Sequence, residues 1–160
     1  MRSIEVRPSR PDDARIARLL GTLDEYLHRQ YPVEEWGTEC NHILDVQALL
    51  QPSITFVAAW EGDSALGCGA IRRLRDGEGD FAEVKRMFVR PEARGQRVGE
   101  RMLLALEDAV RAEGIRRVFL ETGVRQPEAL RLYERCGFTR RGPFGEYEDH
   151  PASIFMGKRL

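Results

Sequence analysis

The feature that most constrains the fold is an apolar strand pattern that leads through a glycine-bearing loop into an amphipathic helix. Residues 81–89 have the strand-like sequence F-A-E-V-K-R-M-F-V, and residues 94–99 form a loop with the sequence R-G-Q-R-V-G. From about residue 95 to residue 113, apolar side chains recur at the spacing of one buried helix face. A strand, a glycine loop and a helix N-terminus together present several backbone N–H groups to an anion. The sequence therefore predicts a site for a phosphate-bearing ligand, with a ligand-free β-to-α turn as the alternative.

Length and composition indicate a globular protein. The chain has 160 residues, of which 42% are hydrophobic and 32% charged, and we expect a single domain over residues 1–160. A formal net charge of −1 argues against a general nucleic-acid binder. No apolar run approaches the ~20 residues that cross a bilayer, and the first residues do not have the pattern of a signal peptide. We therefore expect a cytoplasmic protein without nucleic-acid or membrane partners.

Cysteines and histidines give no sign of a metal centre or a disulfide framework. The three cysteines, Cys40, Cys68 and Cys136, contain no CxxC pair. The three histidines, His28, His42 and His150, are widely scattered along the chain. We expect no bound metal, and a reducing compartment suits this cysteine content. Cys68 and Cys136 are interpreted as small buried side chains rather than nucleophiles.

The hydrophobic periodicity predicts a domain of the α+β class with a mixed sheet. Strands are expected at residues 4–7, 54–60, 65–74, 81–89, 117–124, 138–141 and 152–158. Helices are expected at residues 11–31, 42–50, 95–113 and 127–136. Short turns at residues 61–63 and 76–80 predict that three consecutive strands form an antiparallel meander.

In this order the elements resemble the GNAT superfamily, the acetyl-CoA-dependent N-acetyltransferases. The most specific segment is V-R-P-E-A-R-G-Q-R-V-G at residues 89–99, which is similar to the family's Q/R-x-x-G-x-G/A loop around the pyrophosphate of coenzyme A. A second segment, L-Y-E-R-C-G-F at residues 132–138, resembles the family's L-Y-x-x-x-G-F signature and follows another strand, as in the family. The resemblance implies a three-layer, mostly antiparallel seven-stranded sheet flanked by about four helices.

The resemblance also implies a set of residues that bind acetyl-CoA, the expected co-substrate. They are Met87, Phe88, Val89, Arg94, Gly95, Gln96, Arg97, Val98, Gly99 and Gln126. In the family the strand carrying Met87 splays from its neighbour, so that its main chain can bond the pantetheine arm. Arg97 stands where the family's middle glycine usually sits, but it keeps its backbone N–H and could add a phosphate contact. At the first turn of a helix we expect a negative φ for Arg97, without strain.

Acetyl transfer to an amine needs a neutral nucleophile, a polarised thioester carbonyl and a proton for the departing thiolate. The resemblance gives the acid role to Tyr133, whose ring could also simply pack on the sheet. It makes Glu83, or a water that Glu83 holds, the candidate base. An ion pair with Lys85, two residues on and on the same strand face, is the alternative for Glu83.

The acceptor is less defined by the sequence. Segments that usually border the amine site in this family contain the candidate substrate contacts Trp36, Tyr147, Asp149 and Ser153. The acidic residues around Asp149 favour a cationic small-molecule or peptide amine, or are simply solvated. A homodimer is a possible assembly, since many relatives dimerise through terminal strands. A non-catalytic acyl-CoA-binding sensor or regulatory module is the alternative function, although such a binder would need neither Glu83 nor Tyr133.

Overall fold

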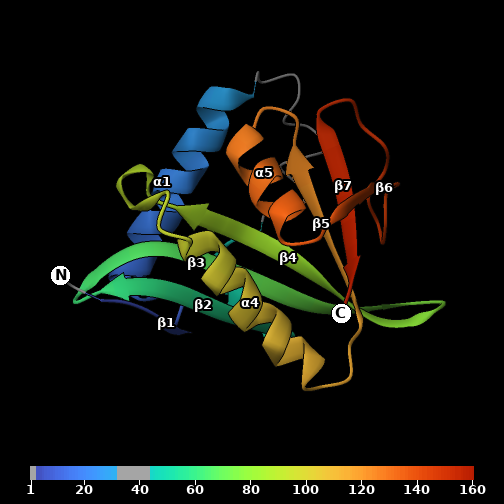
Figure 1. The fold of residues 1–160 in the computed structure, drawn as a ribbon, viewed down its shortest axis with the longest axis horizontal. Coiled ribbons are helices and arrows are strands. Elements are labelled where there is room, and N and C mark those ends of the chain that lie inside the picture. Colours follow the sequence, from blue (N-terminus) through green and yellow to red (C-terminus); the bar gives the residue numbers. More distant parts are fainter. Residues whose placement is uncertain (1–2, 32–43) are drawn as a thin grey trace.

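The computed structural model describes residues 3–31 and 44–160, and its centre is one seven-stranded sheet. The strand order is β1-β2-β3-β4-β5-β7-β6, as Figure 1 shows. Neighbouring strands β4 and β5 run parallel, whereas every other neighbouring pair is antiparallel. The predicted mixed, mostly antiparallel sheet of seven strands is confirmed.

The elements follow the predicted order along the chain. The strands are β1 (Ile4–Pro8), β2 (Ile54–Glu61), β3 (Ser64–Asp76), β4 (Gly79–Val89), β5 (Arg117–Gly123), β6 (Thr139–Arg141) and β7 (Ser153–Arg159). The helices in the described ranges are α1 (Ala14–Gln30), α3 (Val46–Leu49), α4 (Val98–Arg111) and α5 (Pro127–Arg135), with a short 3-10 helix, η3 (Pro91–Ala93). None of these helices is long and apolar enough to cross a membrane.

The helices lie on the two faces of the sheet. Helices α4 and α5 cover one face, where Met102 and Leu106 of α4 are fully buried against strand residues such as Ile71. Helices α1 and α3 cover the opposite face, with Ile16 and Leu19 in a second buried cluster. Figure 1 shows α4 and α5 in front of the sheet and α1 behind it. Each helix has one apolar stripe. Because helices lie on both faces of the sheet, the three-layer arrangement buries these stripes against the strands.

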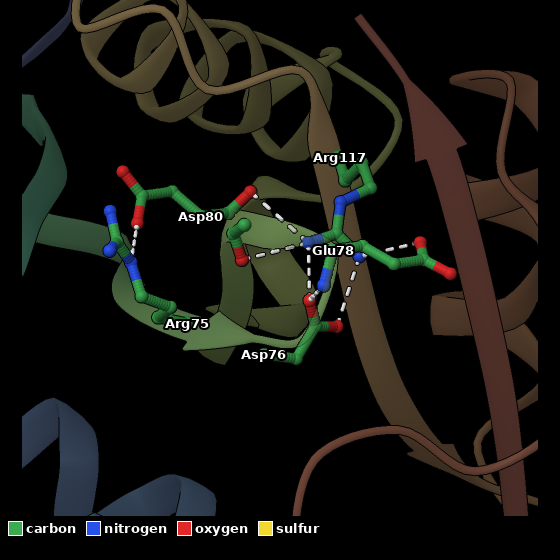
Figure 2. Close-up of polar contacts among 6 residues, drawn as sticks. Arg75, Asp76, Glu78, Asp80 and Arg117 are labelled. Atoms are coloured by element: carbon green, nitrogen blue, oxygen red, sulfur yellow. Dashed lines mark hydrogen bonds and ion pairs between the residues drawn. The ribbon is translucent and has the colours of Figure 1, made fainter.

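One end of the β4–β5 pair is held closed by an arginine, and we call it the clamped end. The two strands pair at Ala82–Val118, Glu83–Phe119 and Val84–Leu120. Beside this ladder, Arg117 donates hydrogen bonds of 2.7 and 3.0 Å to the Asp76 carboxylate and one of 2.9 Å to the Gly79 carbonyl oxygen (Figure 2). The guanidinium thereby lowers the pKa of Asp76 to about 2. Arg117 joins the start of β5 to the β3–β4 turn.

The opposite end of the same pair is open, and we call it the split. Beyond Val84–Leu120, Lys85, Phe88 and Val89 of β4 stay paired with β3, and residues 121–123 of β5 stay paired with β7. A bulge accompanies the divergence: Arg86 has φ +57°, and the β3–β4 register shifts between Cys68 and Ala70. The split leaves main-chain N–H and C=O groups of both strands without a β4–β5 ladder partner.

The buried Arg86 side chain holds this bulge against α1. Its guanidinium Nη1 lies 2.7 Å from the Asp24 carboxylate, and its side chain is only 6% exposed. The extra residue in the bulge shifts the alternation of side chains, so that Lys85 and Arg86 both lie on the α1 face. Met87 and Val89 then return to the α4 face, beside Ala82 and Val84. The bulge thereby sets which β4 side chains reach the split.

The start of α4 corrects one sequence prediction. The helix begins at Val98 rather than near residue 95, and Arg97 is its N-cap residue with φ +59° and ψ 25°. The expectation of a negative φ at Arg97 is wrong, because this residue precedes the first helical turn and directs the chain into it. Left-handed backbone costs a non-glycine residue roughly 1–2 kcal/mol. The glycine usual at this position of the family's loop would avoid that cost.

Candidate active site

A cavity of about 510 Å³ lies at the split and reaches both faces of the sheet. Leu23 and Tyr26 of α1 line it from one face, and Val98 of α4 and Leu132 of α5 line it from the other. Tyr133 and most of the predicted coenzyme residues also line it: Met87, Phe88, Val89, Arg94, Gly95, Arg97, Val98, Gly99 and Gln126. Gln96 and Glu83 are not among the lining residues. The structure therefore gathers the loop, the split and α5 around one space.

The loop at residues 94–99 joins the mouth of this cavity to the N-terminus of α4. Residues 94–97 are exposed, whereas Val98 and Gly99 are buried. The first hydrogen bond of the helix runs from the Arg101 N–H to the Arg97 carbonyl oxygen, at 3.1 Å. The amides of residues 98–100 consequently have no partner within the helix. These amides, the positive end of the helix dipole and the nearby arginines suit a phosphate group.

Gly99 allows α4 and α5 to approach closely. A Cβ atom added at Gly99 would lie 2.8 Å from Cδ2 of Leu132, closer than side chains normally pack. Gln126 fixes the other edge of the site, since its Oε1 accepts hydrogen bonds from the Gly123 N–H (3.0 Å) and the Thr122 hydroxyl (3.1 Å). Gln126 thus ties the end of β5 to the start of α5.

Tyr133 packs on the sheet and also faces the cavity. Its side chain is 6% exposed, and its ring meets Phe138 edge to face at a centroid distance of 5.8 Å. Burial, together with the negative charge of Glu121, raises the pKa of the phenol, so Tyr133 carries its proton at neutral pH. The packing and acid interpretations of Tyr133 are therefore compatible.

Three buried polar side chains form a cluster on the α1 face of β4. The Tyr147 hydroxyl donates a 2.5 Å hydrogen bond to Oε2 of Glu83, and Lys85 Nζ donates a 2.7 Å bond to the Tyr147 oxygen. Lys85 Nζ also lies 3.4 Å from Glu83 Oε2, so the ion pair considered from the sequence is present. Burial lowers the pKa of Lys85, opposed by the charge of Glu83. Burial and then Glu83 raise the pKa of Tyr147. We call these residues the Glu83 cluster.

The other predicted substrate contacts lie in different surroundings. Asp149 is exposed, and Ser153 is the partly exposed first residue of β7, paired with Gly123 of β5. Tyr147 packs against Phe144 and Phe155, which belong to an aromatic cluster beside β5. Trp36, like His42 and Cys40, lies outside the described residues. Of the four predicted contacts, the structure brings Tyr147 to Glu83.

Several cavity residues were absent from the sequence prediction. Arg131, Leu132 and Arg135 line the cavity from α5, and their spacing of three and four residues could have indicated that they share one helix face. Leu23 and Tyr26 come from α1, which the sequence gives no reason to place beside the split. Arg135 is 3.2 Å from Glu100 of α4, an ion pair between the two helices that flank the loop.

A seven-stranded sheet with one open parallel pair and a glycine loop at the following helix defines the fold of acyl-CoA N-acyltransferases. The sequence profile described as Acetyltransferase (GNAT) family matches residues 20–138. The chain belongs to this family and is an N-acetyltransferase enzyme by class.

Individual relatives agree with this assignment. An IAA acetyltransferase of Azospirillum brasilense is 43% identical over 160 residues, covering the whole of both chains. The uncharacterised N-acetyltransferase YsnE of Bacillus subtilis is 33% identical over 151 residues, which cover 93% of this chain and 97% of YsnE.

Solved structures show the same fold. A crystal structure from Klebsiella pneumoniae, described as that of an acyl-CoA N-acyltransferase, has a TM-score of 0.78 and 34% identity, and covers 98% of this chain and 97% of its own. The PaiA N-acetyltransferase of Thermoplasma acidophilum, solved in complex with coenzyme A, has a TM-score of 0.73 at 20% identity and covers 99% of both chains. At that identity the likeness to PaiA concerns the fold alone.

Proposed function

We propose that this protein transfers an acetyl group from acetyl-CoA to a primary amine, directly and within a ternary complex. The observation that carries the proposal is the cavity at the split, which joins the loop at residues 94–99 to the phenol of Tyr133. The 43% identity to a protein named an acetyltransferase supports the same reaction class. A direct transfer needs both substrates at one carbonyl carbon, and the split opens to both faces of the sheet.

Coenzyme A would bind along the cavity from the loop to the split. Its pyrophosphate would meet the amides of residues 98–100, with Arg94 and Arg97 supplying positive charge at the exposed mouth. Its pantetheine arm would follow residues 87–89 of β4, whose main chain has no β5 partner. This position would bring the thioester to the buried hydroxyl of Tyr133.

Tyr133 is the proposed general acid. The amine nitrogen adds its lone pair to the thioester carbonyl carbon, and the tetrahedral intermediate collapses as the C–S bond breaks. The electron pair of that bond goes to sulfur, which takes the phenolic proton of Tyr133; solvent then returns a proton to the phenolate. A buried phenol with a raised pKa remains protonated until the thiolate forms.

The proton lost by the amine needs an acceptor on the other side of the split. Glu83 is the candidate base from the sequence, acting directly or through a water that it holds. Its carboxylate is 3% exposed and engaged by Tyr147 and Lys85, so a proton would reach it through one of these groups or through water. The acidic segment with Glu146, Glu148 and Asp149 supports a cationic small-molecule or peptide amine as the acceptor.

The test is release of the coenzyme A thiol from acetyl-CoA with a panel of primary amines: spermidine, kanamycin, phenylethylamine and a lysine-containing peptide. The proposal expects turnover with at least one of them, accompanied by acetylated amine in the mass spectrum. Tight coenzyme binding without turnover would favour the alternative, a non-catalytic acyl-CoA-binding module. The presence of Tyr133 in the cavity favours the enzyme, because a pure binder needs no acid.

A further inference from the structure

We propose that helix α1 bridges the split and so sets the position of the acceptor side of the cavity; this role rests on the acetyl transfer proposed above. Asp24 of α1 pairs with Arg86 of β4. Tyr31, the C-cap residue of α1, lies on Gly123 of β5. Both strand residues lie beyond the last residue pair of the β4–β5 ladder. We call these two contacts the α1 bridge, because one helix connects two strands that no longer pair with each other.

The contact with β4 is a buried ion pair. Arg86 is 6% exposed, and its Nη1 lies 2.7 Å from the Asp24 carboxylate. Its Nη2 donates a 3.5 Å hydrogen bond to the carbonyl oxygen of Leu20, one turn earlier in α1. The main chain of Arg86 is held from the other side, because its carbonyl oxygen accepts a 3.5 Å hydrogen bond from the Cys68 thiol of β3. A buried guanidinium needs its countercharge, so Asp24 is the group that fixes α1 on the bulge.

The contact with β5 depends on a glycine. A Cβ atom added at Gly123 would overlap the hydroxyl oxygen of Tyr31, so the ring reaches the strand only because residue 123 has no side chain. The same oxygen accepts a 3.3 Å hydrogen bond from the Arg125 N–H. The Arg125 guanidinium lies 5.6 Å from the centroid of the Tyr31 ring, and its Nη1 donates a 3.2 Å hydrogen bond to the Gln30 carbonyl oxygen. The end of α1 is therefore fixed to the end of β5.

The spacing of the two contacts along α1 matches an open strand pair. Asp24 and Tyr31 are two helical turns apart, which places them on one side of the helix. Two turns rise about 10 Å, roughly twice the ~4.8 Å that separates paired strands. Leu23 and Tyr26, which line the cavity, lie within or next to this span. They come from the face opposite α5 and Tyr133, from which the amine would approach the thioester. The α1 bridge therefore fixes the wall that the amine meets.

Loosening the bridge should move α1 rather than the coenzyme site. Beyond the bulge, Phe88 and Val89 stay paired with β3 whether or not α1 is attached. The amides of residues 98–100, proposed to bind the pyrophosphate, belong to α4 on the other face of the sheet. Asp24 and Tyr31 are accordingly positioning residues for the acceptor: their loss should weaken amine binding and leave coenzyme A affinity unchanged. A merely structural role would instead reduce the amount of folded enzyme, which lowers kcat at constant KM.

The first set of variants tests the contact with β4. The probe is the amine of the panel that the wild type acetylates fastest, assayed at saturating acetyl-CoA and well below the melting temperature. We expect Asp24→Asn to raise the amine KM by ~10-fold, as for a displaced binding surface, and to leave the coenzyme A dissociation constant within ~2-fold of wild type by calorimetry. Asp24→Glu, which keeps the charge, should recover part of the loss. Glu25→Gln, the matched control at the exposed neighbouring position of α1, should leave KM unchanged.

The second set tests the contact with β5 by a double-mutant cycle. Gly123→Ala places a methyl group where the Tyr31 hydroxyl lies, so it should displace the ring and raise the amine KM by a factor similar to that of Asp24→Asn. Tyr31→Ala should raise KM as well. In the Tyr31→Ala background, Gly123→Ala should add nothing, because the displaced group is already gone. Any effect of the new methyl group on β5 itself is the same in both backgrounds and cancels in the cycle.

The outcomes distinguish the α1 bridge from the proposed function. A raised amine KM in both sets, with near-wild-type coenzyme A affinity and no added effect of Gly123→Ala in the Tyr31→Ala background, supports the bridge. An unchanged KM, a fall in kcat at constant KM, or a parallel loss of coenzyme A affinity overturns it and leaves acetyl transfer intact. An effect in only one set overturns it too, because a helix attached to one strand does not span the split. A wild-type enzyme without turnover on any amine overturns the proposed function and the role of the bridge with it.

Discussion

The two ends of the β4–β5 pair are built from the same two strands, but one end is closed by hydrogen bonds and the other is open. At the clamped end, Arg117 bonds Asp76 and the Gly79 carbonyl oxygen, and three residue pairs complete the ladder. At the split, the pairing between β4 and β5 ends, and a cavity of about 510 Å³ lies there. A sheet interior normally satisfies every main-chain group, so an open end must be held open by its surroundings.

The difference shows how the fold supports a site without losing the sheet. Three contacts fix the elements around the split: the ion pair of buried Arg86 with Asp24, the hydrogen bonds of Gln126, and the close approach of Gly99 to Leu132. At the clamped end, only a few residues from the split, Arg117 holds the same two strands together. We therefore expect changes at the split to alter ligand binding and catalysis, and changes at the clamp to alter stability.

The largest effect is expected from Gly99→Glu at the split. The new carboxylate would lie in the proposed phosphate site, and like charges there cost several kcal/mol, so coenzyme A affinity should fall by more than ~10²-fold. Gly99→Ala is the matched control, since it brings the same Cβ contact with Leu132 without the charge, and should lose less. Calorimetric titration measures both, and retained affinity in Gly99→Glu would place the phosphate site elsewhere.

Tyr133→Phe should have the next largest effect. Removing the hydroxyl keeps the ring and its contact with Phe138 but removes the acid, so kcat should fall by ~10²-fold. Coenzyme A affinity should stay nearly unchanged. Steady-state kinetics together with calorimetry check both parts, and an unaltered kcat would remove Tyr133 from the acid role.

Arg97→Gly should give a smaller change in coenzyme binding. If the guanidinium contacts a phosphate, an exposed ion pair worth up to about 1 kcal/mol is lost, and affinity should fall ~2–5-fold. Arg97→Ala should lose the same affinity but keep the cost of a left-handed backbone, so Arg97→Gly should be the more stable of the two. Equal affinity in wild type and Arg97→Gly would show that arginine is merely tolerated there.

Arg117→Ala at the clamp should leave kcat unchanged and lower the melting temperature by roughly 2–6 °C. The pKa of Asp76 is lowered from 3.8 to about 2, so the clamp stabilises the fold above pH 3.8 and loses this effect as the pH falls toward 2. The difference in melting temperature between wild type and Arg117→Ala should therefore shrink over that range. Arg75→Ala, which breaks a more exposed ion pair of the same turn, should change little (Figure 2). A fall in kcat for Arg117→Ala would contradict the division between the two ends.

Much of the fold could be predicted from the sequence because its signals are local. Alternating strand patterns, short glycine turns and the apolar stripe of α4 depend on neighbours within a few residues, and the observed order of elements agrees with them. The loop at residues 94–99 was predictable for the same reason. The split was predicted only from the resemblance to a known family, because no local sequence pattern indicates that two strands diverge.

The remainder depends on contacts between distant residues. Glu83 and Tyr147 are 64 positions apart, and the sequence suggested a role for each without their hydrogen bond. The left-handed Arg97 and the bulge at Arg86 are set by how the chain must turn, against the preference of arginine itself.

A crystal structure with bound acetyl-CoA tests the central claim most directly, because the claim is that the split and the loop hold the coenzyme. We expect the pyrophosphate at the amides of residues 98–100, the pantetheine along residues 87–89, and the sulfur within hydrogen-bond reach of the Tyr133 hydroxyl. A coenzyme bound outside the split, or a thioester far from Tyr133, would contradict it.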